Sequence, residues 1–351
     1  MRSPLASVSA IVLLLSAACA TAARLHAKVN PRIVAVHKST RDRRSATAYL
    51  YPCARLSGRG DRAGVSERQG TSRNHAGGAT DRPIRIAVVS DLHTMRDGVG
   101  EQPLYGLRLE QAINAVNLER PDLVLLPGDL TESGSAPQLR DFLSRATSFV
   151  PPVLFVPGNH DVGDKWTPGG DSVADTRTEE YEAVAGRSHF AQVIAGVRLV
   201  AVNASIMGSG SERDAAQWRW LDEEAALHRP GLGVLMIHYP LFLERPDDPG
   251  GSYWTVEPEP RARVLDFIRK ARIRLVVSGH LHRPYVLTRG NVTFAGAPAI
   301  SFGLPPESQP EGWTMITIRS DGSVSCRHRI VDHPDRRQES LPVGFPELEA
   351  G

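Results

Sequence analysis

Cysteine is scarce in this sequence, with 3 residues among 351, and one of them, Cys19, falls within an apolar leader. The other two, Cys53 and Cys326, allow at most one disulfide, and only in an oxidising compartment. A fold held by many disulfides is therefore excluded. A chain of this length can bury a substantial core without such crosslinks.

Long apolar runs are also lacking. The run Val8–Ala18 is short for a membrane span and rich in alanine and serine, so no transmembrane span is predicted. Because Arg2 precedes this run and small residues follow it, we predict a signal peptide over residues 1–23. The chain is then expected to be exported, to the cell envelope, the periplasm or the medium. Lipid anchoring at Cys19 is less favoured, since serine stands where a lipobox usually has leucine.

A strong excess of one charge is missing overall, because the net charge is only +2. The balance is uneven, however: residues 24–82 hold 13 Lys and Arg against 4 Asp and Glu, and residues 83–351 hold 27 against 35. We predict a basic, disordered linker over 24–82, a catalytic domain over 83–332 and a tail over 333–351. A basic arm could bind nucleic acid or anionic lipid. Aromatic and basic residues do not interleave, so no specific nucleic-acid binding is expected.

Ordered structure is predicted from Ile84 onward, where short apolar runs begin to alternate with stretches of helical periodicity. Strands are predicted over Ile84–Ser90, Asp122–Pro127, Val153–Pro157, Arg198–Asn203, Gly233–His238, Ile273–Ser278, Tyr285–Thr288, Val292–Ala295, Thr314–Arg319 and Val324–Val331. Helices are predicted over Leu107–Arg120, Ala136–Phe149, Arg213–Leu227 and Pro260–Ala271. Alternating strands and helices favour a layered α/β domain.

Polar clusters of one kind follow five of the predicted strands. Loops at the carboxyl ends of strands in an open α/β sheet share one edge and form a crevice there. We therefore expect the five clusters to converge, although they are scattered along the chain. They are Ser90-Asp91-Leu92-His93, Gly128-Asp129, Gly158-Asn159-His160-Asp161, His238 and Gly279-His280-Leu281-His282.

The side chains in these clusters suit metal ions. Carboxylate, amide oxygen and imidazole together favour manganese, iron or zinc over calcium or copper. If the backbone is extended at Asp91-Leu92-His93 and at His280-Leu281-His282, both ligand-type side chains of each triplet point to one side. Sharp turns and a close backbone approach are expected at three glycines, Gly128, Gly158 and Gly279.

Each cluster also has a plainer interpretation when taken alone. Asp91-Leu92-His93 or Gly128-Asp129 would ordinarily be a strand-end turn, and His238 would ordinarily be a core histidine with satisfied hydrogen bonds. All five clusters in this order, each at a strand end, are hard to obtain by accident. The set as a whole therefore predicts a metal site.

In order, the clusters match the motifs D-x-H, G-D, G-N-H-D, H and G-H-x-H. On these residues the chain resembles the calcineurin-like metallophosphoesterase superfamily, over about residues 84–320. The resemblance implies an α/β fold, a four-layer α-β-β-α sandwich with two mixed sheets and the site at the carboxyl ends of strands. It also implies an enzyme, a phosphoric ester hydrolase with two metal ions.

The resemblance further implies a role for each ligand. Asp129 would bridge the two metals, which suits a carboxylate because its two oxygens can each serve one cation. The first metal would be held by Asp91, His93 and His282, and the second by Asn159, His238 and His280.

Two cations held together can lower the pKa of a shared water, so we expect in-line attack on phosphorus by a metal-bridging hydroxide. His160, the neighbour of a ligand, is expected to act at the leaving-group oxygen as general acid or charge stabiliser. Asp161 could orient the His160 ring through its second nitrogen. The alternative is that Asp161 caps a helix or turn.

One residue differs from a subgroup of this superfamily, the purple acid phosphatases. Purple acid phosphatases place a tyrosine ligand three residues after the bridging aspartate, and here that position is Glu132. Together with His93, this arrangement is similar to class III cyclic-nucleotide phosphodiesterases and related phosphatases.

The substrate stays open at this point. A phosphodiesterase and a phosphomonoesterase, including a protein phosphatase, would use the same metals, so a small phosphate ester, a nucleotide or a phosphoprotein are the candidates. A non-catalytic scaffold is disfavoured because His160 and every ligand are present. In the loop Tyr239–Glu259, Tyr253 and Trp254 could stack on a base or could simply anchor the loop. Residues 164–175 are a second candidate rim.

Overall fold

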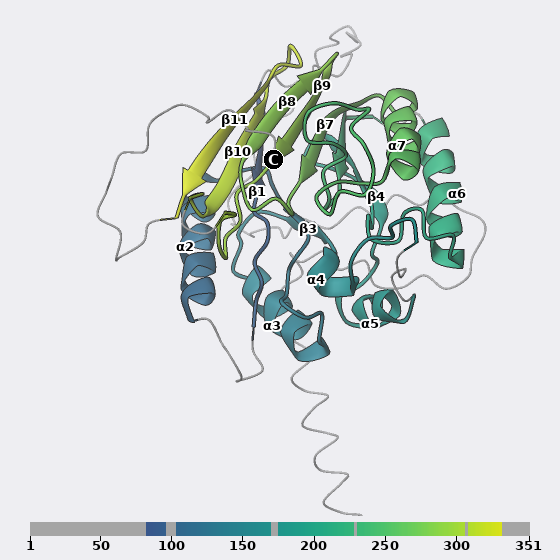
Figure 1. The fold of residues 1–351 in the computed structure, drawn as a ribbon. Helices are drawn as coiled ribbons and strands as arrows, with labels where there is room; N and C mark the ends of the chain where they lie inside the picture. The colour runs from purple at the N-terminus through teal and green to yellow at the C-terminus, as the bar shows by residue number, and fades with distance from the viewer. Residues whose placement is uncertain (1–81, 96–102, 170–174, 228–229, 306–307, 332–351) are drawn as a thin grey trace, which may run out of the picture.

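The computed structural model describes residues 82–331, except 96–102, 170–174, 228–229 and 306–307 (Figure 1). The predicted signal peptide, nearly all of the basic linker and the C-terminal tail lie outside the described residues. Cys53 does too, so its pairing with Cys326 stays a prediction. None of the described helices combines the length and the apolar character that crossing a membrane requires.

The first sheet has five strands in the order β11-β10-β1-β2-β3. Strands β1, β2 and β3 run parallel to one another, and β10 is antiparallel to both β1 and β11. The bounds are β1 Ile84–Val88, β2 Leu123–Pro127, β3 Val153–Val156, β10 Gly312–Ile318 and β11 Val324–Ile330.

The second sheet has six strands in the order β4-β5-β6-β7-β9-β8. Its centre, from β5 to β9, is parallel, and the outer strands β4 and β8 are antiparallel to their neighbours. The bounds are β4 Phe190–Ile194, β5 Val197–Ala201, β6 Leu232–Met236, β7 Ile273–Ser278, β8 Tyr285–Arg289 and β9 Val292–Gly296.

The helices are α2 Pro103–Glu119, α3 Ala136–Ala146, α4 Asn159–Val162, α5 Asp175–Ala185, α6 Glu212–Ala226 and α7 Pro258–Lys270. The four predicted helices and ten predicted strands are all present, with ends shifted by a few residues. Helices α4 and α5 and strand β4 were not predicted from the sequence. Helix α5 carries six charged or hydroxyl residues over Asp175–Glu180 and buries only three of its side chains, so it lacks a clear apolar stripe.

Three separate apolar cores hold four layers together. Alternation along β1 sends Ile86 and Val88 to one face, toward the second sheet, and Ala87 and Val89 to the other, toward α2 and α3. The outer face of the second sheet packs in the same way on α6 and α7, which Figure 1 shows side by side. The predicted α-β-β-α sandwich with two mixed sheets is therefore confirmed.

The two sheets meet at the end where the parallel strands finish. The chain leaving β9 crosses to the first sheet there: the amide of Ala297 donates to Ser278 at the end of β7, and the amide of Ile300 donates to Ser90 just beyond β1. Loops from both sheets consequently share one edge, as the sequence analysis expects.

Candidate metal centre

The five polar clusters converge at this shared edge. One group of possible ligand atoms, within 4.8 Å of one another, comes from Asp91, His93, Asp129 and His282. A second such group comes from Asp129, His238 and His280. All of these side chains are buried. Residues that lie far apart in the sequence therefore form one compact polar centre in the protein interior.

Asp129 is the member that both groups share. Its Oδ1 lies 3.3 Å from Nε2 of His238, and its Oδ2 lies 3.7 Å from Nε2 of His93. The two oxygens of one carboxylate thus face two different imidazoles. This is the arrangement expected of a carboxylate that serves two cations at once.

The imidazoles are oriented by acceptors behind them. Nδ1 of His238 donates to the carbonyl of Pro127, and Nδ1 of His282 donates to the carbonyl of Phe302, both at 2.8 Å. A carbonyl oxygen only accepts, so these contacts fix the Nδ1 proton and turn Nε2 toward the centre. Such support from behind is typical of histidines that bind metal.

Asn159, at the start of α4, completes the second group. Its Oδ1 accepts from Nε2 of His238 at 2.9 Å, and its Nδ2 donates to the hydroxyl of Tyr253 at 3.2 Å. The amide is thereby turned with its oxygen inward, as a metal ligand requires.

Burial and charge together set the protonation of the centre. Burial opposes the imidazolium of His238, but the Asp129 carboxylate outweighs it and raises the pKa of His238 to about 9. Burial likewise opposes ionisation of Asp129, yet His238 holds the pKa of that carboxyl well below its usual range. Burial lowers the pKa of His280 and of His282, so both stay neutral at pH 7, the form that binds a cation. The centre therefore favours positive charge and offers the neutral imidazoles of His280 and His282 as ligands, which fits bound metal ions.

The backbone at these positions differs from the predicted extended form. Asp91, His93, Asp129, His280 and His282 have φ values of 54°, 47°, 47°, 69° and 51°, all in the left-handed region. The side chains converge because of these turns and not because of strand alternation. The turns also aim amides at the carboxylates: the amide of His280 donates to Oδ1 of Asp91 at 3.0 Å.

The expected close approach at the motif glycines is present. A Cβ on Gly158 would collide with Oδ1 of Asp129, and a Cβ on Gly279 would collide with the hydroxyl of Ser90. Gly128 also has a positive φ, 101°, and its Cβ would lie 2.5 Å from Nδ1 of His238. These glycines let the ligand-bearing loops pack directly on one another.

Asp161 does not orient His160, so that prediction is wrong. Its carboxylate accepts from the amides of Gly158, Leu130 and Thr131 at 2.8 to 3.1 Å, and from the Thr131 hydroxyl at 2.7 Å. Burial raises the pKa of Asp161 to about 6. The alternative, a cap that ties the loop after β3 to the loop after β2, describes what this side chain does.

His160 is held by a different group. Its Nδ1 donates to the carbonyl of Glu132 at 2.8 Å, and its side chain is about one-third exposed. The ring lies edge-on to His93, with the centroids 4.4 Å apart. His160 therefore lies beside the buried groups, and within the described parts of the chain its Nε2 makes no hydrogen bond.

Glu132 is a contributor to the site to which the sequence analysis gave no role. Its carboxylate accepts from Nδ1 of His93 at 2.8 Å, and this contact raises the pKa of His93 against the effect of burial. In the sequence, the only indication of a role for Glu132 was its position three residues after Asp129, where purple acid phosphatases have a tyrosine ligand.

A pocket of about 380 Å³ adjoins the centre, with Asn159, His160, Asp164, Arg177 and Tyr253 in its wall. It brings both predicted rims together, although residues 170–174 of the second rim lie outside the described residues. The Tyr253 ring also lies 5.0 Å from that of His280. Stacking of Tyr253 or Trp254 on a substrate stays a prediction.

The Tyr253 loop is anchored from below by a buried ion pair between Lys165 and Glu257. The second oxygen of Glu257 accepts from the amide of Gly251 at 2.9 Å. The two rims are therefore tied to each other at their bases, which supports the anchoring interpretation of this loop.

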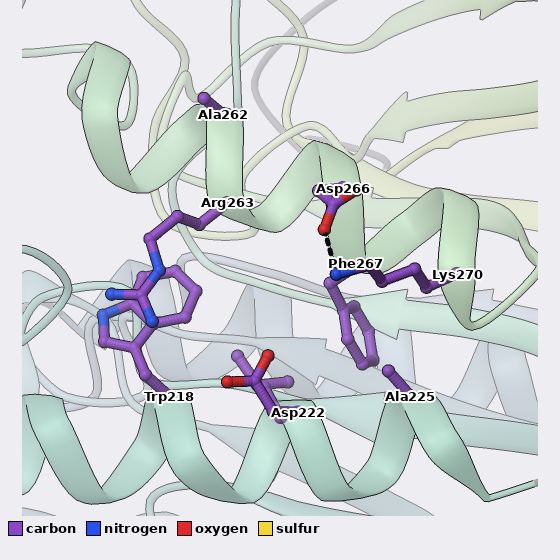
Figure 2. Close-up of a pocket in the computed structure, with 9 residues that line it drawn as sticks. Trp218, Asp222, Ala225, Ala262, Arg263, Asp266, Phe267 and Lys270 are labelled. Carbon is purple, nitrogen blue, oxygen red and sulfur yellow. Dashed lines mark ion pairs between the residues drawn. The ribbon is translucent and has the colours of Figure 1, made fainter.

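A larger pocket, of about 430 Å³, lies between α6 and α7 and contains none of the motif residues. Figure 2 shows its wall, where the Arg263 guanidinium lies 3.9 Å from the Trp218 ring centroid and Asp266 pairs with Lys270. Its charged side chains are Asp222, Arg263, Asp266 and Lys270, and none of them belongs to a group of possible metal ligands among the described residues. The chemistry belongs to the smaller pocket.

Comparison with known proteins agrees with this geometry. The model of the family described as calcineurin-like phosphoesterase matches residues 84–284. Human "Serine/threonine-protein phosphatase CPPED1" is 28% identical over 268 residues, which are 72% of this chain and 82% of the human protein. "Probable cyclic nucleotide phosphodiesterase" of Synechococcus sp. is 29% identical over 262 residues, 71% of this chain and 93% of that protein.

Among solved structures, the purple acid phosphatase PPD1 of yellow lupin is similar, with a TM-score of 0.51 at 14% identity. The match covers 72% of this chain but about half, 52%, of the lupin chain. At that identity the likeness supports the fold alone.

Proposed function

Since this chain belongs to the calcineurin-like phosphoesterase family, we propose that its two groups of ligand-type side chains hold two metal ions that act jointly on one phosphate ester. The chain is a hydrolase of phosphoric esters. The observation that carries the proposal is the position of Asp129, whose two oxygens face His93 and His238 from the centre of both groups.

Each side chain has a definite task in this proposal. Asp91, His93 and His282 hold the first ion, and Asn159, His238 and His280 hold the second. The donor set of carboxylate, amide oxygen and imidazole supports manganese, iron or zinc. When bound, the two ions supply an activated water and offset negative charge on the phosphate.

His160 handles the leaving group. Because Nδ1 is committed to the Glu132 carbonyl, the transferable proton is on Nε2. In this role His160 donates that proton to the departing oxygen, while the pocket beside it receives the organic part of the ester.

The first experiment compares bis-p-nitrophenyl phosphate with p-nitrophenyl phosphate, using purified, manganese-loaded protein and the same protein after chelation. We expect metal-dependent release of p-nitrophenol that chelation abolishes and added metal restores. Faster cleavage of the diester would support a phosphodiesterase, and faster cleavage of the monoester would support the alternative, a phosphatase. No cleavage of either ester with two metal ions bound would contradict the proposal.

Glu132→Gln is expected to weaken binding of the first metal ion about 10- to 100-fold, the usual effect of removing a group that supports a ligand from behind. The amide still accepts from His93 but carries no charge to strengthen the imidazole. Metal titration followed by elemental analysis checks this. The matched control is Glu110→Gln on the exposed side of α2, which should bind metal as the parent does. Equal affinities for both variants would remove Glu132 from the site.

From the leader sequence alone, we propose in addition that the protein is exported. Mass spectrometry of the N-terminus after expression in a secreting host tests this. A retained Met1 in the cellular fraction would contradict export.

A further inference from the structure

Arg177 lies in the first turn of α5 and presents an exposed side chain to the pocket beside His160. Its Nη2 donates to the carbonyl of Ser133 at 2.9 Å and is 3.4 Å from the carbonyl oxygen of His160. Both acceptors are uncharged backbone groups. Among the residues that the structure describes, the guanidinium is thus held at the pocket wall by neutral acceptors alone.

The positive charge of Arg177 has no ion-pair partner among the described residues. Within the part of the chain that the structure describes, no carboxylate lies within 4.0 Å of its guanidinium, and its Nε and Nη1 make no hydrogen bond. Two acids of α5, Glu179 and Glu182, pair with Arg213 of α6 and not with Arg177. Unlike Arg145 and Arg213, Arg177 has no such partner among the described residues, and it faces the pocket.

Two acids share the pocket with Arg177. Glu132 gives its carboxylate to His93, and this hydrogen bond holds the pKa of Glu132 below its usual range. Asp164 is exposed at the rim. Neither meets the guanidinium, so both leave its free N–H groups available to a ligand. Arginine offers planar, forked donors that match a carboxylate or a phosphate better than a single point charge does.

We propose that Arg177 binds a second anionic group on the leaving-group side of the substrate, and that the preferred substrates are phosphate esters whose organic part carries a carboxylate or a further phosphate. The proposal rests on the proposed function, because it takes His160 to mark the leaving-group side. It adds a substrate class, which the metal centre alone does not specify.

A matched pair of esters isolates the second charge. The pair is 4-carboxyphenyl phosphate and 4-carbamoylphenyl phosphate, which differ in charge but hardly in size. The full, manganese-loaded chain should prefer the carboxylate about five- to tenfold in kcat/KM, as expected for one charge-assisted contact at a partly exposed site. Arg177→Gln should abolish this preference mainly through KM for the carboxylate ester and leave the carbamoyl ester nearly unchanged. Arg177→Lys should keep part of it.

Arg140→Gln is the matched control, because Arg140 is exposed on α3 and does not line the pocket. It should retain the full preference. If Arg177 only positions His160 through the backbone, Arg177→Gln would lower kcat equally for both esters. That result, or no change for either ester, would overturn the proposal.

Binding gives a second readout that needs no turnover. Calorimetry would compare 4-carboxybenzylphosphonate with 4-carbamoylbenzylphosphonate on the same metal-loaded proteins. Tighter binding of the carboxylate by the parent, lost in Arg177→Gln, would support the subsite even if neither ester is hydrolysed, in which case the proposed function alone fails. Equal dissociation constants in the parent would overturn the subsite itself.

Discussion

Asp129→Asn should lose at least one metal ion and about a thousandfold or more of kcat/KM. A carboxamide has one oxygen and one NH₂ group, so it can face a cation on one side only, whereas each Asp129 oxygen faces a different imidazole. Metal ions contribute several kcal/mol of transition-state stabilisation, and each 1.36 kcal/mol is a factor of ten in rate. Elemental analysis and steady-state kinetics on the same preparation check both parts of the expectation.

A fold defect must be separated from a metal defect in this variant. The substitution preserves size, and the amide of His160 that donates to Oδ1 at 3.0 Å can still find an oxygen there. The chelated parent and the chelated variant should both unfold in one cooperative transition, at a lower temperature in the variant because it loses the buried ion pair with His238. Asp222→Asn, at an exposed position on α6, is the matched control and should keep both metal ions and full activity. Two tightly bound ions in Asp129→Asn would exclude a bridging role.

His160→Ala is expected to lower turnover about 10²- to 10⁴-fold while both metal ions stay bound. The ring contacts His93 edge-on and is held by the Glu132 carbonyl. His160 belongs to neither group that contains Asp129, only to a third possible group with His93 and Glu132. Kinetics and metal content measured together distinguish this result from that of Asp129→Asn.

Esters with leaving groups of different basicity give a more specific test of the role of His160. A proton donor matters little when the departing oxygen is stable as an anion, and matters greatly when it is not. The loss in His160→Ala should therefore be smaller for p-nitrophenyl esters than for phenyl or alkyl esters. A loss of the same size for all of these esters would rule out general acid catalysis and leave charge stabilisation of the phosphate as the role.

The strands and the convergence of the motifs could be predicted because both depend on local rules. A run such as Leu123–Pro127 is apolar on both faces, which indicates a strand buried between layers. Polar residues directly after such strands must meet, because parallel strands finish at one edge of their sheet. From these two facts a layered α/β domain and the convergence of the motif residues around Asp129 follow, whereas the two-sheet sandwich was implied by the resemblance to the family.

The remaining features depend on tertiary contacts. Helix α5 has no strong periodic pattern of its own and lies against α3 and α4, so Arg177 on it could not be placed at the pocket from sequence. The contact between Glu132 and His93 requires the loops after β1 and β2 to run side by side, as the bridge between Thr94 and Thr131 makes them do. Asp161 has three of its four donors on the loop after β2, which no nearby sequence pattern reveals.

The left-handed turns at Asp91, His93, Asp129, His280 and His282 have a consequence for how much change the molecule can tolerate. For residues other than glycine such turns cost on the order of 1 kcal/mol each, less where aspartate or histidine bonds locally. Five of them amount to a sizeable part of the roughly 5–15 kcal/mol by which a domain is stable. The apolar cores between the layers must offset this sum before any cation arrives. A large-to-small substitution deep in those cores would thus first weaken the positioning of the ligand side chains, at a loss of stability too small to unfold the domain.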